Sequence, residues 1–563
     1  MIPLSLENLI KGRMPKMNPE VTSGFVKHEM DNADVLIDRV FRGAFESLCS
    51  NITYVGMQRC KPEEEYRFNL KRNGGPSNAK GRYELARSDI FLTKVLFEVD
   101  GHLQKPTLLY IPYCDDTGLT HLRGTAHTIS PVLEDPGVSV TRDGCFFRVA
   151  CDKIVVKRIG HTYCKDELNI LQKIVTTQKH VNIPYGKIYR AKAQKANSAK
   201  SAPVTTLPHY LFAKYGVTYV YKHFANVEVV FGYDHEITEQ THPSSEWSRY
   251  YSAKQPPSGN KAKRLAWQAS HVALAVKTTT PSTLVEILTA GYFYVADYAS
   301  SDFMPEYSDN LEHWVMMMGR MVFNKTVKFS QMLEYLAPHF ASLDTYLDEM
   351  TRESLLEEGV AVDNIYELFV FIIMSLDQMI NNVNLASMYG KKLSILPYLL
   401  SPIIHGIFFT KFNLMQLCKV RIPDPETGEE KMIFTERNLQ DVLTANLKPE
   451  AIYNIKKSEY GFKSSLAAPG DNKMFKILSK IVLQQNAIVP SGRSNESPML
   501  DMSKSLDASI ADGFCYLHVT KPEPTGRAHM SPWKVLVKGK FKPNPVFQDV
   551  LSKAQAIITR RNI

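Results

Sequence analysis

The sequence contains none of the short motifs that mark a self-contained active site. It has no GxxxxGK[ST] phosphate loop, no GxGxxG after an expected strand, no HExxH and no GxSxG. Acidic clusters occur near residue 31, at 61–67 and at 114–116, but none has the Asp-x-Asp spacing that presents two carboxylates to one magnesium ion. Asp115 and Asp116 precede Gly118, which favours a turn. The residues alone therefore offer no catalytic centre.

Cysteine is also scarce. The 563 residues include eight cysteines, and no two of them form a Cys-x-x-Cys pair. This spacing argues against a zinc site and against a disulfide framework, and scattered free thiols suit a reducing compartment. The 16 histidines do not cluster either. We therefore expect no metal or other cofactor to be bound by this chain.

Long uninterrupted hydrophobic runs are missing as well. Residues 1–19 lack the charged and apolar regions of a secretory signal. The most apolar stretch, residues 393–417, is long enough to span a bilayer, but Pro397, Pro402 and Lys411 interrupt it. We predict a buried helix pair there, and no association with a membrane.

The length and charge of the chain indicate a folded protein with several domains. Hydrophobic residues make up 44% and charged residues 22%, and 563 residues exceed what one core normally holds. The net charge is +9, and residues 521–563 alone carry nine basic and two acidic residues. Such a local excess favours a polyanionic partner, because phosphate neutralisation releases counterions. A solvated basic tail is the alternative.

The spacing of apolar residues separates helical from strand-like regions. Helices are predicted within 19–50, 305–420 and 436–488, strands within 90–160 and 185–300, a hairpin or loop within 421–440, and loops with short strands within 489–545. The methionines at 316–318 fit a hydrophobic core better than a binding surface. The pattern predicts an α+β fold in which a β-rich section is inserted between helical ones.

Three segments carry a family resemblance. Residues 111–138, IPYCDDTGLTHLRGTAHTISPVLEDPGV, lead through a strand-turn-strand to Pro136-Gly137-Val138. Residues 387–412 begin with the aromatic-Gly-Lys-Lys turn SMYGKKL, and residues 494–533 end in a Gly526-Arg527 turn framed by prolines. In this order the segments resemble the N-terminal half of the β (second-largest) subunit of multisubunit DNA-dependent RNA polymerases.

The resemblance implies a multidomain α+β architecture with a β-rich lobe inserted in a mixed α/β protrusion, followed by a loop-rich fork region. Its parts are expected at 1–140 (first part of the protrusion), 141–375 (lobe-like insertion with following helices), 376–465 (second part of the protrusion) and 466–563 (fork, ending at a subunit split). The Glu-Thr-Pro-Glu-Gly run that follows the Gly-Arg turn in the family is missing here. Split β subunits occur in the polymerases of very large (jumbo) bacteriophages, so a phage origin is implied.

The resemblance also implies roles for individual basic residues. Arg527 would face the phosphates of the incoming nucleotide, where a guanidinium can bind two oxygens, and Lys521 would assist. Nucleic acid would be contacted by Arg493, Lys504, Lys391, Lys392, Lys534, Lys538, Lys540 and Lys542. Each has a structural alternative: Arg527 could bind its own loop, and the others could be solvated surface. Lys391 and Lys392 are expected to open a helix.

The partners follow from the same resemblance. In the family, the carboxylates that hold the catalytic Mg²⁺ lie on the β′-type chain. Implied partners are a C-terminal β-like subunit, β′-like subunits, the DNA template, nascent RNA and NTPs, and whether a promoter-specificity subunit joins stays open. The expected location is the cytoplasm of an infected bacterium or, alternatively, the virion. A competing hypothesis is a non-catalytic virion or scaffold protein with a polymerase-derived fold that binds nucleic acid or other subunits; a stand-alone single-strand-binding protein is a third.

Overall fold

The chain forms two compact units. The computed structural model describes residues 30–46, 51–72, 88–115, 119–122, 124–129, 132–134, 136–141, 144–149, 152–186, 188, 204–254, 271–299, 302–323, 328–343, 346–382, 392–417, 421–423, 430–432, 436–448, 466–467, 482–485, 527–529, 534–537, 540–543 and 545–561. Unit 1 takes in Met1–Pro136 and Leu385–Ile563, and unit 2, Gly137–Asn384, is inserted within it. Helices and sheets occur in both, which confirms the multidomain α+β class. The identification of parts as protrusion, lobe and fork stays a prediction.

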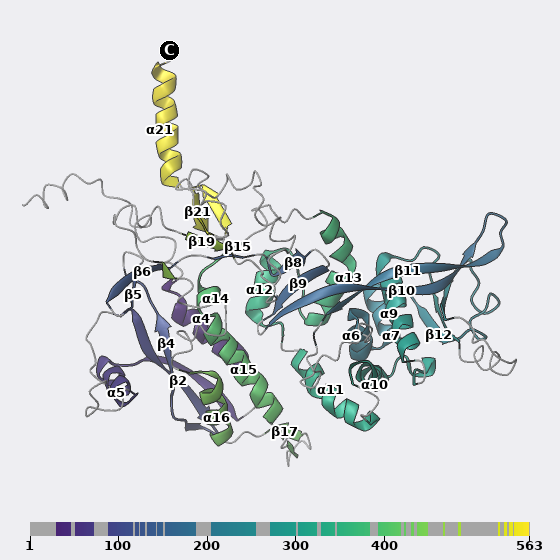
Figure 1. The fold of residues 1–563 in the computed structure, drawn as a ribbon, viewed down its shortest axis with the longest axis horizontal. Coiled ribbons are helices and arrows are strands. Elements are labelled where there is room, and N and C mark those ends of the chain that lie inside the picture. Colours follow the sequence, from purple (N-terminus) through teal and green to yellow (C-terminus); the bar gives the residue numbers. More distant parts are fainter. Residues whose placement is uncertain are drawn as a thin grey trace, which may run out of the picture. The chain divides into compact units, whose positions relative to one another are not determined.

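Unit 1 contains a four-stranded antiparallel sheet on which a helix packs (Figure 1). Its strands are β1 (Ile52–Arg59), β2 (Ile90–Val99), β3 (His102–Leu103) and β4 (Thr107–Pro112), and helices α4 (Ala33–Phe45) and α5 (Pro62–Arg72) accompany them. Helix α4 contacts β1 and β4. The ring of Phe45 lies 4.9 Å from that of Phe97, and Phe41 stacks on Tyr54 at 5.2 Å. These buried aromatic rings form the core between helix and sheet.

The apolar stretch at 393–417 forms the predicted buried helix pair in unit 1. Its helices are α14 (Leu396–Leu399) and α15 (Ser401–Leu417), followed by the hairpin β16 (Arg421–Pro423) and β17 (Glu430–Met432) and by α16 (Glu436–Asn446). Helix α15 packs on α4 and α16. At Gly406 an added Cβ would lie 2.7 Å from Cδ2 of Leu447 and 3.0 Å from the carbonyl oxygen of Asn446, so a larger residue would require these neighbours to shift. Among the described residues, no helix combines the length and the apolarity needed to cross a membrane.

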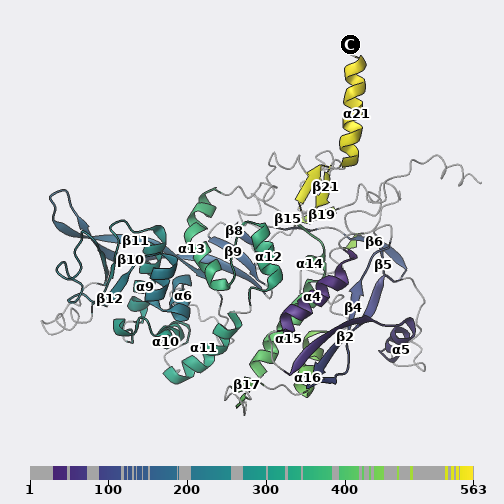
Figure 2. The same cartoon turned by 180° about the vertical axis from the view of Figure 1, so that it is seen from behind.

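Unit 2 is built on a seven-stranded antiparallel sheet. The strands are β8 (Val138–Thr141), β9 (Gly144–Val149), β10 (Asp152–Leu168), β11 (Ile174–Gly186), β12 (Val229–Tyr233), β13 (Ser248–Ser252) and β14 (Val272–Val276). The order is β12-β14-β13-β10-β9-β8, and β11 pairs with β10. Strands β10 and β11 form a ribbon that extends past the other strands (Figure 2).

Helices cover this sheet and supply most of the core of unit 2. They are α6 (Leu207–Tyr215), α7 (Val217–Phe224), α9 (Thr283–Tyr298), α10 (Leu311–Val322), α11 (Phe329–Leu343), α12 (Glu349–Glu357) and α13 (Ile365–Asn382), with a 3-10 turn at Pro305–Tyr307. Tyr292 of α9 and Phe212 of α6 pack around the fully buried Trp314. Met317 and Met318 are buried as well, which confirms the core reading of the methionine run.

Two segments of unit 2 that we predicted as strands are helices. Residues 217–224 form α7, and residues 290–298 lie in α9. Both are rich in aromatic and β-branched residues, which favour strands when taken alone. Helix α9 is buried on nearly every side, so tertiary packing outweighs this preference. The hydroxyl of Ser282 caps its first turn by accepting from the N–H of Val285.

Candidate nucleic-acid interface

The three segments that carry the family resemblance meet in one small sheet of unit 1. Strand β7 (Val132–Glu134) comes from the first segment, β15 (Lys392–Ser394) from the second and β20 (Arg527–His529) from the third. The fourth strand, β19 (Val482–Gln485), belongs to the region between the last two. The strand order is β15-β7-β19-β20. Segments separated by hundreds of residues in the sequence are thus hydrogen-bonded neighbours.

The register of this sheet assigns the basic residues to definite positions. Lys392 is paired with Glu134, and Gln484 with both Val132 and Arg527. Paired residues lie on the same side of a sheet and sides alternate along a strand. Positions 392, 394, 132, 134, 482, 484, 527 and 529 therefore share one side. The opposite side takes Leu393, Leu133, Leu483, Gln485 and Ala528.

The two sides differ in chemistry. One side takes the positions of Lys392, Glu134, Gln484, Arg527 and His529 together with Ser394, Val132 and Val482, whereas the other takes three leucines, one alanine and one glutamine. Such alternation is typical of a sheet with one buried face and one polar face. Lys392 and Arg527 lie on the two outer strands, which are about 14 Å apart across the sheet. The polar side is therefore a candidate surface for phosphate oxygens.

The pairing distinguishes these two basic residues. Lys392 stands opposite an acidic residue, and such cross-strand pairs stabilise a sheet by roughly 0.2–1 kcal/mol. Arg527 stands opposite the neutral Gln484. Position 527 therefore fits phosphate binding better than position 392, because the pairing of Lys392 with Glu134 already accounts for a lysine there. The prediction that Lys392 opens a helix is wrong, because residues 392–394 form a strand and α14 begins at Leu396.

A second basic element is the hairpin of β21 (Lys534–Val537) and β22 (Lys540–Pro543). Val537 pairs with Lys540 at one end of this hairpin. The register places Lys540 and Lys542 on one side and Lys534 on the other. Lys542 is exposed. The lysine cluster predicted from sequence is thus divided between two faces. Helix α21 (Pro545–Arg561) follows, and sequence reasoning did not predict it.

Five of the predicted site residues lie outside the described residues: Lys521, Arg493, Lys504, Lys391 and Lys538. Of the others, the structure brings Arg527 and Lys392 into one sheet and Lys534, Lys540 and Lys542 into one hairpin. Helices were also predicted across 436–488. Residues 436–446 are helical, but 466–467 form β18, which pairs with β6 (Thr125–Ile129), and 482–485 form β19. The β18-β6 pairing adds a strand to the hairpin of β5 (Leu119–Leu122) and β6.

A hydrogen-bonded cluster that the sequence analysis missed lies at β5 and includes His121, Asp89 and Asp115. The Nδ1 of His121 lies 2.7 Å from Oδ2 of Asp89, and the N–H of His121 donates to the same oxygen. The side chain of Asp115 accepts from the N–H of Leu119, whereas Asp116 and Gly118 of the predicted turn lie outside the described residues. Among the described residues, no group of three or more His, Cys, Asp or Glu side chains could hold a metal ion.

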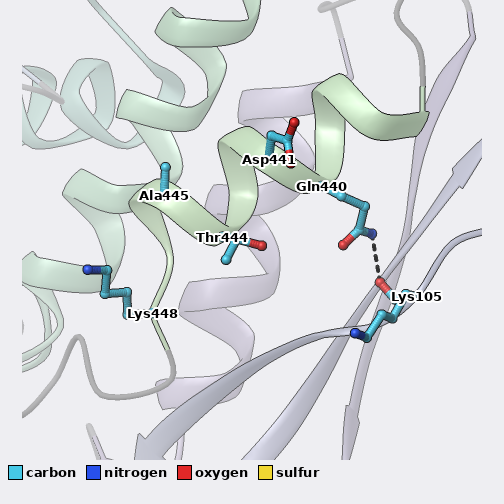
Figure 3. Close-up of a pocket in the computed structure, with 6 residues that line it drawn as sticks. All are labelled: Lys105, Gln440, Asp441, Thr444, Ala445 and Lys448. Carbon is cyan, nitrogen blue, oxygen red and sulfur yellow. Dashed lines mark hydrogen bonds between the residues drawn. The ribbon is translucent and has the colours of Figure 1, made fainter.

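A shallow depression lies beside α16 in unit 1 (Figure 3). Its lining consists of Lys105, Gln440, Asp441, Thr444, Ala445 and Lys448. The Nε2 of Gln440 donates to the carbonyl of Lys105 at 2.9 Å. Apart from this bond the lining is exposed to solvent, so the depression offers little to enclose a small substrate.

Comparisons with known proteins complete this description. A family model described as "Non-virion RNA polymerase subunit" matches residues 6–547. No curated protein matches the chain. The family description names a polymerase subunit that does not travel in the virion, and this speaks against the virion alternative.

Proposed function

Because the chain belongs to the family of non-virion RNA polymerase subunits, we propose that it is a nucleic-acid-facing subunit of a multisubunit phage RNA polymerase. We further propose that it takes the place of the N-terminal half of a β subunit. It would line one side of the DNA cleft and of the RNA–DNA hybrid in the cytoplasm of the infected bacterium. Its partners would be a C-terminal β-like chain and β′-like chains, with the Mg²⁺-binding carboxylates on the latter.

The observation that carries this proposal is the sheet β15-β7-β19-β20. The three segments that resemble β-subunit regions were identified separately along the sequence, yet each contributes one strand to this sheet. The shared sheet therefore supports the reading that all three belong to one ancestral framework.

The basic positions have specific roles in this proposal. Arg527, at the start of an outer strand, would bind the phosphates of the incoming nucleotide, since a guanidinium stays charged and can donate to two phosphate oxygens. Lys540 and Lys542 share one face of their hairpin and would contact the nucleic-acid backbone. Contacts to phosphates position the strands without reading their sequence.

One observation favours a second candidate function. The family model covers almost the whole chain under a description that names a subunit without assigning it to β. The chain could accordingly be an accessory subunit that joins a core whose β-like part is supplied by another chain. A promoter-specificity subunit is the clearest example of that class.

The composition of the assembled enzyme decides between the two candidates. We would co-express the tagged chain with the other polymerase subunits of its genome, purify the complex and identify every chain by mass spectrometry. The β assignment expects no other chain with a β-like N-terminal half. If such a chain is present in the active complex, the β assignment fails and the accessory function remains.

The proposed role of Arg527 needs a separate test in that complex. Arg527→Ala should leave assembly intact and raise the KM for NTPs about tenfold or more, because charged hydrogen bonds to phosphate are lost. Arg527→Lys keeps the charge without the paired donors and should recover part of the loss. Lys553→Ala, at an exposed lysine of α21 that pairs with Asp549, is the matched control. Equal KM values for wild type and Arg527→Ala would overturn this assignment.

A further inference from the structure

The ribbon of β10 and β11 in unit 2 ends in a group of exposed apolar side chains. The exposed fractions are 60% for Leu168, 102% for Ile170 and 75% for Leu171. Ile174 and Val175, on the returning strand, are 41% and 42% exposed. Single exposed apolar side chains are common, but five within eight residues form a patch, and such patches mark interaction surfaces.

The tip is held in one conformation by its own hydrogen bonds. The Oδ1 of Asn169 accepts from the N–H of Leu171 at 3.0 Å and from the N–H of Lys173 at 2.7 Å. Two backbone bonds, from Asn169 to Lys173 and from Gln172 to Asn169, close the same turn. Gln172 adopts a φ of 56°, a conformation that non-glycine residues seldom take. A turn closed in this way presents Ile170 and Leu171 without the entropy loss of ordering a loop on binding.

Within the part of unit 2 that the structure describes, the end of the ribbon pairs with no other strand. Strand β10 pairs with β9 through Lys157 and with β13 through Lys165. Among the described residues, β11 pairs with β10 and makes one isolated bridge, from Tyr185 to Thr206, at the end of the ribbon away from the tip. Beyond Asp166, which binds Arg249, the two strands pair only with each other. Figure 2 shows this end of the ribbon extending beyond the neighbouring strands.

The charge of the tip excludes a polyanion as its main partner. Glu167 and Lys173 are the only charged residues in 167–176. Binding to nucleic acid requires several cations near the phosphates. The depression beside α16 on a second copy of this chain would also fit the apolar tip poorly, because its lining includes the charged residues Lys105, Asp441 and Lys448. A near-neutral apolar tip instead fits an apolar pocket on a different protein chain.

We propose that the tip of the β10-β11 ribbon, centred on Ile170 and Leu171, inserts into an apolar pocket on another protein subunit of the same polymerase. The inference uses only the membership of a subunit family, and it holds whether the chain takes the β place or an accessory one. Ile170 and Leu171 are the central contacts, and Asn169 is a positioning residue that keeps the turn closed.

The test uses the full chain co-expressed with the other polymerase subunits and purified through a tag on this chain. The double variant Ile170→Asp, Leu171→Asp should lower the recovered amount of one partner subunit about tenfold, because two central apolar contacts are lost. Leu356→Asp, at a residue 63% exposed on α12 of the same unit, is the matched control and should retain every subunit. Unchanged subunit ratios in the tip variant would overturn the inference.

A second measurement covers the case in which the tip variant does not fold. A photoreactive phenylalanine analogue at position 171, in an otherwise unchanged chain, is activated in the assembled and transcribing enzyme. The inference expects cross-links to one partner subunit. Cross-links to DNA or RNA, to a second copy of this chain, or to nothing would each overturn it. If the subunit composition of the enzyme rules out the β assignment, the cross-linking result is unaffected. The two proposals can therefore fail independently of each other.

Discussion

The backbone N–H of Gly137 donates to both carboxylate oxygens of Glu358, at 2.8 Å to Oε1 and 2.7 Å to Oε2. Gly137 is the first residue of unit 2, and Glu358 lies 221 residues further along the chain. Gly137 precedes β8, and Glu358 directly follows α12, whose end is closed by Gly359 at a φ of 87°. A Cβ at position 137 would lie 3.2 Å from Oε2 of Glu358. The contact therefore fixes the entry of the chain into unit 2.

Removal of this carboxylate should destabilise unit 2. Glu358→Ala leaves the half-buried N–H of Gly137 without its acceptor, and we expect the free energy of unfolding to fall by about 1–3 kcal/mol. Glu358→Gln keeps one acceptor and should cost less. Glu357→Ala, at the exposed neighbour, serves as control. Urea unfolding followed by tryptophan fluorescence measures the difference, and equal midpoints for Glu358→Ala and wild type would contradict the prediction.

The resemblance in sequence pointed to Gly137 but not to its partner. The Pro-Gly-Val run was recognisable because its residues are adjacent, whereas Glu358 is 221 residues away. The same reason limited the prediction of the candidate site. Lys392 and Arg527 were selected one by one for charge and local turn signals, and their common sheet depends on pairings with β7 and β19 that no local pattern encodes.

Local propensity was informative where one face of an element is solvated. Strand β2 alternates buried and partly exposed residues and was predicted, and its Asp100-Gly101 turn carries the signal of a two-residue hairpin. Propensity failed for α9, because a helix buried on all sides has no polar face to reveal its period. It failed again for β15, where three residues are too few to show any period.

Unit 2 should lose stability in mild acid because of two buried histidines. Burial lowers the pKa of His209 to about 4 and that of His339 to about 4, from an ordinary 6.5. The folded state therefore binds fewer protons, and stability present above pH 6.5 is lost as the pH falls toward 4. For each histidine we expect about 2 kcal/mol less stability at pH 5 than at pH 7.5.

A variant of His209 tests this dependence. The Nε2 of His209 lies 2.8 Å from the carbonyl of Trp314, so the neutral ring donates there. His209→Gln retains a donor but cannot be protonated in this range, and it should remove about half of the stability lost between pH 7.5 and pH 5. The fluorescence of Trp314, whose ring contacts His209, reports unfolding. A variant with the full wild-type pH dependence would show that His209 plays no part in it.

The β21-β22 hairpin should bind nucleic acid through one face. In the assembled enzyme, the double variant Lys540→Gln, Lys542→Gln should reduce the salt dependence of DNA affinity, log Kd against log salt, by about 2, since each phosphate contact contributes roughly one unit. Lys534→Gln combined with Lys553→Gln removes the same charge. Lys534 lies on the other face of the hairpin, and Lys553 pairs with Asp549 at 2.6 Å. This second double variant should therefore change the salt dependence of DNA affinity by less than the first.

Fluorescence anisotropy with a labelled duplex, repeated over a series of salt concentrations, gives both slopes. Equal slopes for the two double variants would mean that the hairpin acts only through net charge. The assignment of a binding face would then be wrong, although a general attraction for polyanions would remain.

A charge exchange between Lys392 and Glu134 should separate a structural role of Lys392 from a binding role. The two residues are direct partners across β15 and β7. Lys392→Glu alone places two acidic residues opposite each other and should destabilise unit 1 by up to about 1 kcal/mol. Adding Glu134→Lys restores an opposite-charge pair and should recover the stability, which thermal unfolding of the two variants measures.

If Lys392 serves only the sheet, transcription by the assembled enzyme recovers with stability. If Lys392 also contacts nucleic acid, the exchanged pair recovers stability but not DNA affinity, because the positive charge now stands one strand further from the edge. A double variant no more stable than Lys392→Glu would contradict the pairing itself.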